Sequence, residues 1–110
     1  MKTIKIATDY SETPLGRYRE DGNFNGTRFR EEFLRPALLD DEQVVVDIDG
    51  VEGYGSSFLD EAFGGLVRDD QFDVAELEKK LRIKCDDPDF RFYRDLIWKY
   101  IREARVRQAA

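Results

Sequence analysis

Three short stretches of the chain carry apolar residues in patterns that are typical of β-strands. In residues 2–7 apolar and polar side chains alternate, with Ile4 and Ile6 on one face. Residues 43–48 contain three consecutive valines, which is typical of a central parallel strand covered on both faces. Residues 81–85 alternate again. The pattern therefore predicts three strands, separated by longer stretches with a different period.

Those intervening stretches carry apolar residues at steps of three and four, the period of an amphipathic helix. The predicted helices cover about residues 27–39, 58–67, 73–80 and 88–104. Pro36 should kink or end the first of them, because proline has no N–H and crowds the carbonyl of Glu32. Asp87 is expected to cap the last helix, with Pro88 at its first position.

Polar residues mark two further helix ends. Asp73 and Glu76 resemble a capping box at the start of the third helix. Arg102, Arg105 and Arg107 lie near the end of the last helix, where the negative end of the helix dipole favours cations. Both features agree with the boundaries that the apolar periodicity predicts.

A turn-rich connection at residues 10–25 joins the first strand to the first helix, and Asp21-Gly22 is expected to close a short hairpin within it. The order of elements implies a small α/β sandwich, with a mostly parallel sheet of three to five strands covered by about four helices. With 110 residues, we expect a single domain, 1–110, with its core at about residues 2–104.

Composition removes several classes of chemistry. The sequence contains no histidine, which excludes catalytic triads, histidine general bases and histidine-bearing zinc motifs. The single cysteine, Cys85, excludes an internal disulfide and a multi-cysteine metal site. A net charge of −6 argues against nucleic acid as a partner. With no export signal and no long apolar run, we expect a cytoplasmic protein that does not contact a membrane.

The stretch from Asp47 to Glu61 concentrates the candidate chemistry. A buried strand ends there, glycines follow, and Ser56 and Ser57 open a helix. Free N–H groups at a helix N-terminus favour an anion, and a serine there is accessible to modification. Ser57 is expected to be the N-cap, which leaves the Ser56 hydroxyl without a structural task.

Three aspartates suggest a second kind of site. Asp9, Asp47 and Asp49 lie near the carboxyl ends of two predicted strands, where ligands of open α/β sheets bind. Paired carboxylates there would hold Mg²⁺. The glycines in residues 53–55 match the dinucleotide-binding pattern only in part. The alternative is that the three aspartates are solvated acids in turns.

Arginines and aromatic residues cluster in the connection and the first helix. Five arginines make this region locally basic: Arg17, Arg19, Arg28, Arg30 and Arg35. Since acidic residues are interspersed, the cluster is either a network of surface ion pairs or an arginine fork for a phosphate or a partner carboxylate. Aromatic residues in predicted loops are candidate partner anchors, namely Tyr10, Tyr18, Phe24 and Tyr54.

Several of these motifs together resemble a known superfamily. The strand, turn and helix from Val44-Val-Val-Asp-Ile-Asp-Gly-Val51 to Gly55-Ser-Ser-Phe-Leu-Asp-Glu-Ala-Phe-Gly-Gly-Leu66 resemble the signature of STAS domains, the sulfate-transporter and anti-sigma-factor-antagonist superfamily. More narrowly, residues 4 to about 86 resemble the bacterial STAS-like family DUF4325. That resemblance rests on Pro14-Leu-Gly-Arg-Tyr18, Asp21-Gly22, Phe29-Arg-Glu-Glu32 and Ser56-Ser-Phe-Leu-Asp-Glu-Ala-Phe63.

The resemblance implies a non-enzymatic, protein-binding regulatory domain with no cofactor and no metal. In anti-sigma factor antagonists a histidine-kinase-like ATPase phosphorylates a serine at the start of this helix, and the unphosphorylated form binds that kinase. The match places Ser56 at the phosphorylatable position, with Ser57 next to it. The usual Asp-Ser-Ser-Gly-Leu pattern reads Gly-Ser-Ser-Phe-Leu here. A phosphate would add almost two negative charges beside Asp60 and Glu61.

We therefore expect a partner surface at the opening of this helix and on the adjoining loops. Besides Ser56 and Ser57, its expected contact residues are Tyr54, Gly55, Phe58, Asp60, Glu61, Arg17 and Tyr18. Two other functions stay open: a phosphate- or nucleotide-binding or Mg-dependent phosphoryl-transfer protein, and a scaffold subunit of a bacterial defence or toxin-type complex. The sequence leaves the oligomeric state and the identity of the partner open.

Overall fold

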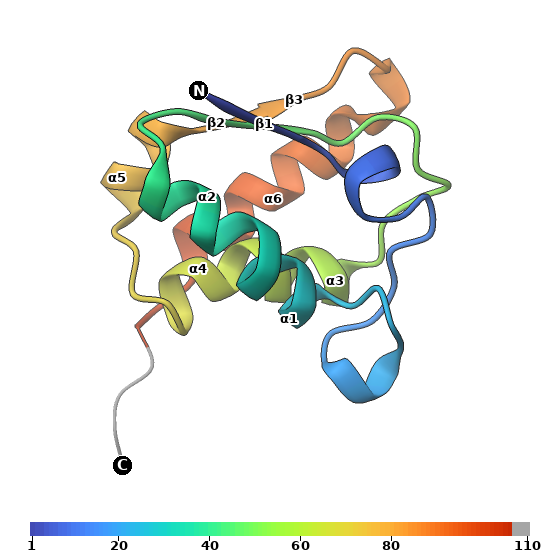
Figure 1. Ribbon diagram of the computed structural model, residues 1–110, viewed down its shortest axis with the longest axis horizontal. Helices are drawn as coiled ribbons and strands as arrows, with labels where there is room; N and C mark the ends of the chain where they lie inside the picture. Colours follow the sequence, from blue (N-terminus) through green and yellow to red (C-terminus); the bar gives the residue numbers. More distant parts are fainter. Residues whose placement is uncertain (107–110) are drawn as a thin grey trace.

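The computed structural model describes residues 1–106. A three-stranded parallel sheet forms the upper layer of the molecule (Figure 1). The strands lie in the order β1 (Lys2–Lys5), β2 (Val44–Asp47) and β3 (Leu81–Lys84). The register aligns Ile4 with Val46 and Val46 with Ile83. The three predicted strands are confirmed, although Ile6 leaves the first strand and opens a single π-helical turn, Ile6–Tyr10.

Helices form the second layer. Their bounds are α1 (Gly26–Phe29), α2 (Arg35–Asp40), α3 (Ser56–Leu59), α4 (Gly65–Arg68), α5 (Val74–Lys80) and α6 (Arg91–Glu103). A π-helical turn at Arg30–Leu34 joins α1 and α2 into one helix, and a second at Asp60–Gly64 joins α3 and α4. No helix within the described part of the chain has the length and apolar character to cross a bilayer.

Pro36 neither ends nor breaks the helix in which it lies. The widened turn comes immediately before it, where the N–H of Arg35 donates to the carbonyl of Arg30, and the helix continues to Asp40. Such single π turns shift the backbone hydrogen-bond register by one residue and are a common way for helices to absorb a local irregularity. The expected kink is thus replaced by a wider turn on the N-terminal side of the proline.

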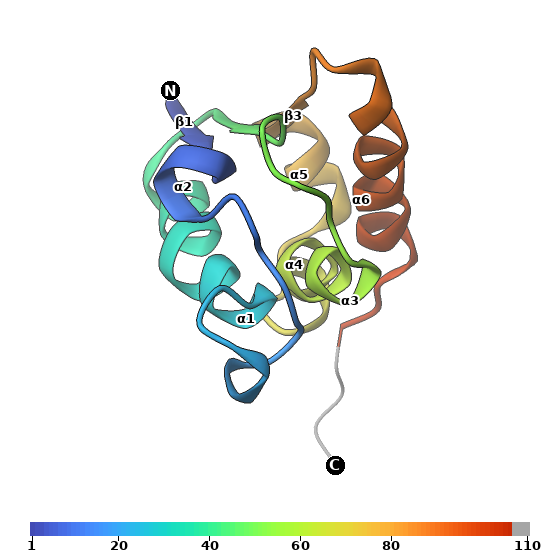
Figure 2. The same cartoon turned by 90° about the vertical axis from the view of Figure 1, so that its right-hand side faces the viewer.

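The labelled helices all lie on one side of the sheet, below it in both views (Figures 1 and 2). Right-handed crossovers between strands that are neighbours in the sequence place the connecting helices on the same face. The other face carries Thr3, Val45 and Arg82 in register, of which Thr3 and Arg82 are exposed. The prediction that the central strand is covered on both faces is therefore wrong, because the neighbours of Val45 on the open face are polar.

No hairpin forms in the connection between β1 and α1. Residues Arg19–Asp21 adopt a 3₁₀ turn instead, and the Asp21 carboxylate accepts hydrogen bonds from the N–H groups of Arg17 (3.1 Å) and Tyr18 (2.9 Å). The predicted hairpin is wrong because this carboxylate takes the backbone donors that a ladder would use. The loop closes further out, where the N–H of Leu15 donates to the carbonyl of Phe24 (2.9 Å).

The signals at the start of the last helix are confirmed. The Asp87 carboxylate accepts a hydrogen bond from the N–H of Asp89 (2.9 Å), and Pro88 opens a 3₁₀ turn that leads directly into α6. At α5, Asp73 occupies the N-cap position but its side chain makes no capping hydrogen bond, so the predicted capping box does not form.

The basic residues at the end of the chain divide into three cases. Arg102 lies in the last turn of α6, as predicted. Arg105 follows the helix and hydrogen-bonds the carbonyl of Arg102 (3.2 Å). Arg107 lies outside the described residues.

The core fills the space between the sheet and the helices. Phe29 on α1, and Phe58 and Phe63 on the joined α3–α4 helix, are fully buried. The ring centroids of Phe29 and Phe58 lie 5.9 Å apart, and those of Phe29 and Phe63 6.4 Å. Aromatic contacts thus hold the α1–α2 helix against the helix that Ser56 and Ser57 open.

Gly26 allows these two helices to approach closely. A Cβ at this position would lie 2.8 Å from the carbonyl oxygen of Phe58 and 2.9 Å from the Cβ of Glu61. Because that oxygen is helix backbone, the helices would have to separate. We expect Gly26→Ala to lower the free energy of unfolding by about 1–3 kcal/mol in urea denaturation. Gly55→Ala is the matched control, since no atom lies within 4 Å of its Cβ position. Equal stabilities for the two variants would contradict the close approach.

Candidate functional site

The N-terminus of α3 presents two serines to solvent. Gly55 is the N-cap, with φ −79° and ψ 148°, and Ser56 and Ser57 are the first two helical residues. The prediction that Ser57 caps the helix is therefore wrong: the extended residue that precedes the helix is a glycine, which has no side chain to offer as a cap. Both serines are exposed. Neither hydroxyl is needed to begin the helix.

Tyr54 fixes the turn that leads to these serines. Its hydroxyl donates to the carbonyl of Ile48 at 2.8 Å, and its ring lies 6.0 Å from that of Phe58 and 5.2 Å from that of Tyr93. Burial raises the pKa of the Tyr54 phenol well above its usual value, so the hydroxyl stays a hydrogen-bond donor. The turn is held by a buried side chain that ties the end of β2 to the start of α3.

Three of the expected partner contacts lie inside the protein. The exposed fraction is 8% for Tyr54, 0% for Phe58 and 3% for Glu61. Tyr54 and Phe58 belong to the aromatic core, and Glu61 faces α1. These three predictions are corrected: the residues support the opening of α3 from beneath and do not face a partner. A signal for Phe58 was present, since it lies four residues before Ala62, on the apolar stripe of the same helix.

Two loop aromatics proposed as partner anchors also have structural tasks. Tyr10 is buried, its hydroxyl donates to the carbonyl of Asn25 (2.7 Å), and burial raises its pKa to about 12. Phe24 packs edge-on against Tyr10, with ring centroids 5.4 Å apart, and the Arg28 guanidinium lies 5.5 Å from the centre of the Phe24 ring. Of the loop aromatics, Tyr18 is the one with nearly half of its surface exposed, at 47%.

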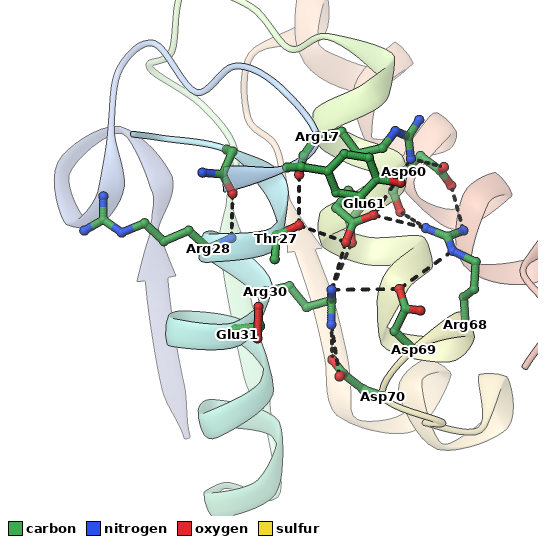
Figure 3. Close-up of polar contacts among 12 residues, drawn as sticks. Arg17, Thr27, Arg28, Arg30, Glu31, Asp60, Glu61, Arg68, Asp69 and Asp70 are labelled. Atoms are coloured by element: carbon green, nitrogen blue, oxygen red, sulfur yellow. Dashed lines mark hydrogen bonds and ion pairs between the residues drawn. The ribbon is translucent and has the colours of Figure 1, made fainter. Parts of the chain in front are cut away.

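The structure brings Arg17 and Asp60 together, although they are far apart in the sequence (Figure 3). Arg17 Nη1 donates to Asp60 Oδ2 at 2.7 Å, and this hydrogen bond raises the pKa of Arg17 above its usual value. Arg68 approaches the other carboxylate oxygen of Asp60 at 3.4 Å. The ion pair places the loop that carries Arg17 and Tyr18 beside the first turns of the α3–α4 helix. Sequence reasoning had selected both residues without predicting that they pair.

A buried ion network lies behind this surface pair (Figure 3). Arg30 is 5% exposed, and its guanidinium donates to Glu61 Oε2 (2.8 Å), to the Glu61 carbonyl (3.1 Å) and to both carboxylate oxygens of Asp70 (3.0 Å each). Burial alone would lower the pKa of Arg30, but the hydrogen bonds to Glu61 and Asp70 raise it above the usual arginine value. The guanidinium is fully engaged within the protein, so this arginine is not a fork for an external phosphate.

Other arginines of the cluster form surface pairs, as the first of the two interpretations predicts. Arg19 and Arg28 each lie 3.3 Å from the carboxylate of Glu32. The hydrogen bond from Arg28 lowers the pKa of that exposed carboxyl. Arg35 reaches the Asp70 carboxylate at 2.9 Å from a half-exposed position. The arginine cluster therefore contains one buried guanidinium, that of Arg30, surrounded by ion pairs at the surface.

The three aspartates of the magnesium alternative each accept a hydrogen bond from a backbone N–H. Asp9 accepts a hydrogen bond from the N–H of Lys5 (2.8 Å), and Asp47 accepts one from the N–H of Asp49 (3.0 Å). Asp49 in turn accepts from the N–H of Asp86 (2.8 Å). Across the residues that the structure describes, no three His, Cys, Asp or Glu side chains form a group that could hold a metal ion. Asp9 is a solvated acid, as the alternative predicts, whereas Asp47 is buried and Asp49 ties the end of β2 to the residues that follow β3.

Three residues of the network were missed by sequence reasoning. The Thr27 hydroxyl lies 3.0 Å from both the Arg17 carbonyl and Glu61 Oε2, and its one hydrogen is shared between these two acceptors. Arg68 lies 3.6 Å from the Glu61 carboxylate, and Asp70 pairs with Arg30 at 3.0 Å. None of the three has a local sequence signal, because their partners come from other segments. The nearest local sequence signals are Gly26 and Gly65, because a glycine within a helix often marks close packing.

Comparison with protein families now identifies the chain. Residues 25–89 match the model of the STAS-like domain of unknown function DUF4325. The chain belongs to the DUF4325 family of STAS-like domains. The match includes β2, the opening of α3 and β3, and it begins after β1 and the loop that carries Arg17 and Tyr18. Comparison with curated proteins gives no match, and neither does comparison with solved structures.

Proposed function

We propose that this DUF4325 domain is a non-catalytic regulatory module that binds a protein partner through the opening of α3 and is switched by phosphorylation of Ser56. The observation that carries the proposal is the exposure of Ser56 and Ser57 at the first turn of a helix whose cap is Gly55. Their hydroxyls are free for a kinase to reach. The partner class that fits the STAS resemblance is a histidine-kinase-like ATPase.

Support for a compact contact surface comes from the loop beside the serines. The pair between Arg17 and Asp60 holds the loop that carries exposed Tyr18 against the α3–α4 helix, one turn after Ser56. Tyrosine and arginine are enriched among residues that dominate binding energy at interfaces. The proposed surface therefore consists of Gly55, Ser56, Ser57 and Asp60 from the helix, and Arg17 and Tyr18 from the loop.

Electrostatics provides the physical basis of the switch. Helix N-termini favour anions, so a phosphate on Ser56 would be tolerated by the fold itself. On the protein surface, the phosphate would place almost two negative charges one helical turn from Asp60. Binding of the partner would have to remove water from these charges. Phosphorylation would thus weaken the complex and leave the fold in place.

The proposal predicts the outcome of a capture experiment. Tagged protein incubated in lysate of its own host with ATP and Mg²⁺ is expected to retain an ATPase of the histidine-kinase-like class, with phosphate on Ser56 or Ser57 in the peptide mass spectrum. Ser56→Asp should then bind the purified partner at least about tenfold more weakly in calorimetry, a loss of about 1.4 kcal/mol. Ser56→Ala should retain binding and lose the modification.

A charge change elsewhere controls for general repulsion. Ala75→Asp introduces the same charge at an exposed position in the first turn of α5, where the helix dipole tolerates it, and should leave the affinity unchanged. Wild-type affinity for Ser56→Asp would contradict the charge switch. A stoichiometric partner that binds an unmodified protein, and tolerates both Ser56→Asp and Ser57→Asp, would favour the scaffold function in its place.

A further inference from the structure

β1 leaves one edge of the sheet unpaired. It is the first strand in the order β1-β2-β3, so only its other edge meets a neighbour. The N–H of Lys2 donates to the carbonyl of Gln43 (2.9 Å), on the side of β2. In a parallel strand the N–H and C=O of one residue point to the same side, and successive residues alternate. The backbone groups of Thr3 and Lys5 therefore point away from the sheet.

The two outward-facing residues differ in what they offer. The N–H of Lys5 is already occupied, because it donates to Asp9 Oδ2 at 2.8 Å. This contact closes the far end of the edge, in the way that proteins commonly protect exposed strands. Thr3 is exposed, and within residues 1–106 no side chain hydrogen-bonds its backbone groups. The available length of the edge is therefore short and centred on Thr3.

A groove runs along this same stretch of the edge. Its volume is about 370 Å³, and it lies between β1 and the α1–α2 helix. Ile4, Phe33, Pro36 and Ala37 supply an apolar floor, and Lys2, Glu32, Asp40 and Asp41 form the rim. Glu32 is paired with Arg19 and Arg28, and Asp41 lies 3.8 Å from the N-terminal ammonium. Asp40 is exposed and makes no ion pair within residues 1–106, so it keeps this end of the rim acidic. A strand added beside β1 would place alternate side chains into the groove, since side chains alternate between the faces of a sheet.

From this juxtaposition we propose that the edge of β1 and the adjoining groove bind an extended, basic segment of a protein partner by β-strand addition. Thr3 exchanges main-chain hydrogen bonds with one residue of the segment. The residues that flank it point to the groove, one apolar side chain over Ile4 and Ala37 and one lysine or arginine towards Asp40 and Asp41. Main-chain pairing supplies the affinity, and the acidic rim selects for positive charge.

This site is distinct from the proposed serine switch. None of its lining residues belongs to α3 or to the loop with Arg17 and Tyr18. In Figure 1, α2 lies on the left of the molecule and α3 on the right. The inference therefore holds or fails independently of the proposed function.

A random octapeptide library displayed on phage provides the probe. Selection on the wild-type protein, with removal of phage that also bind Thr3→Pro, is expected to enrich peptides that alternate apolar residues with lysine or arginine. Proline at position 3 removes the outward-facing N–H, and proline is tolerated on an edge strand whose N–H faces solvent. On addition of an enriched synthetic peptide, exchange of the Thr3 amide hydrogen should slow in the wild-type protein.

A charge reversal tests the rim without disturbing the fold. Asp40→Lys is expected to weaken the enriched peptide about tenfold in fluorescence anisotropy. Asp40 is exposed at the end of α2, where a cation is favoured by the helix dipole, so lost binding would not reflect lost stability. Asp95→Lys makes the same reversal on the exposed side of α6 and should leave the affinity unchanged.

Three results would overturn the proposal. The first is a selection that yields no peptides that distinguish wild type from Thr3→Pro, and the second is one that yields acidic peptides whose binding is unchanged by Asp40→Lys. In the third case, sedimentation would show a concentration-dependent dimer that Thr3→Pro abolishes, which would assign the edge to a second copy of the chain.

Discussion

Replacing Arg30 by methionine is expected to destabilise the protein by about 3–5 kcal/mol. The side chain keeps its length, but Glu61, which is 3% exposed, loses the cation that lies 2.8 Å from it. Asp70 loses the Nη1 donor that contacts both of its carboxylate oxygens. The remaining cations lie farther from Glu61, Arg68 at 3.6 Å and Arg17 at 3.9 Å, so they offset less of the desolvation cost of this buried carboxylate. Urea denaturation at neutral pH measures the loss.

Arg35→Met is the matched control for that substitution. Arg35 pairs with the same Asp70 at 2.9 Å, but its side chain is 38% exposed, so we expect a cost of no more than about 1 kcal/mol. The double variant Arg30→Met/Glu61→Leu should be more stable than the sum of its single changes, because it removes both buried charges together. Similar losses for Arg30→Met and Arg35→Met would show that burial does not set the strength of the network.

Phe58→Ala is expected to cost about 3–5 kcal/mol of unfolding free energy. The ring is fully buried and packs between Phe29, at 5.9 Å, and Tyr54, at 6.0 Å. Removing it leaves a cavity beneath the first turn of α3, lined by other aromatic residues that are fixed by their own contacts. Thermal and urea denaturation should both report the loss.

The same substitution on the surface provides the comparison. Phe92, on α6, is 66% exposed, and Phe92→Ala should change the stability by no more than about 0.5 kcal/mol. If Phe58→Ala kept its full stability and lost only partner binding, Phe58 would be a contact residue, as the sequence suggested. A large loss of stability identifies it as a support for the serines.

Much of the secondary structure followed from the sequence, and the reason is local. Alternation identified the first and third strands, a run of valines identified the second, and three- and four-residue steps identified the helices. The two periods are properties of the backbone itself. Asp87 and Pro88 were read correctly for the same reason: a cap and a first helical residue act on neighbours within one turn. The hairpin prediction was wrong because the Asp21 carboxylate accepts hydrogen bonds from backbone N–H groups that a hairpin would pair with the opposite strand.

The candidate site was predictable only in part. The motif predicted the turn before α3 and its exposed serines. It did not predict which of its charged residues lie at the surface and which are buried, because tertiary contacts decide that. Asp60 and Glu61 are adjacent in the sequence, and one pairs with Arg17 at the rim while the other is buried against Arg30. Adjacent helical positions point 100° apart, so which of them meets α1 depends on how the two helices pack.

By itself, the sequence determined the order of strands and helices, the absence of histidine chemistry, and a glycine-serine helix opening that is typical of STAS-like domains. Only the tertiary structure decided that the sheet is open on one face, that Arg30 is buried between two carboxylates, and that the edge at Thr3 adjoins an acidic groove. A periodic pattern states which residues share a face. What that face meets depends on contacts between segments that are far apart in the chain, and those contacts leave no mark in the local sequence.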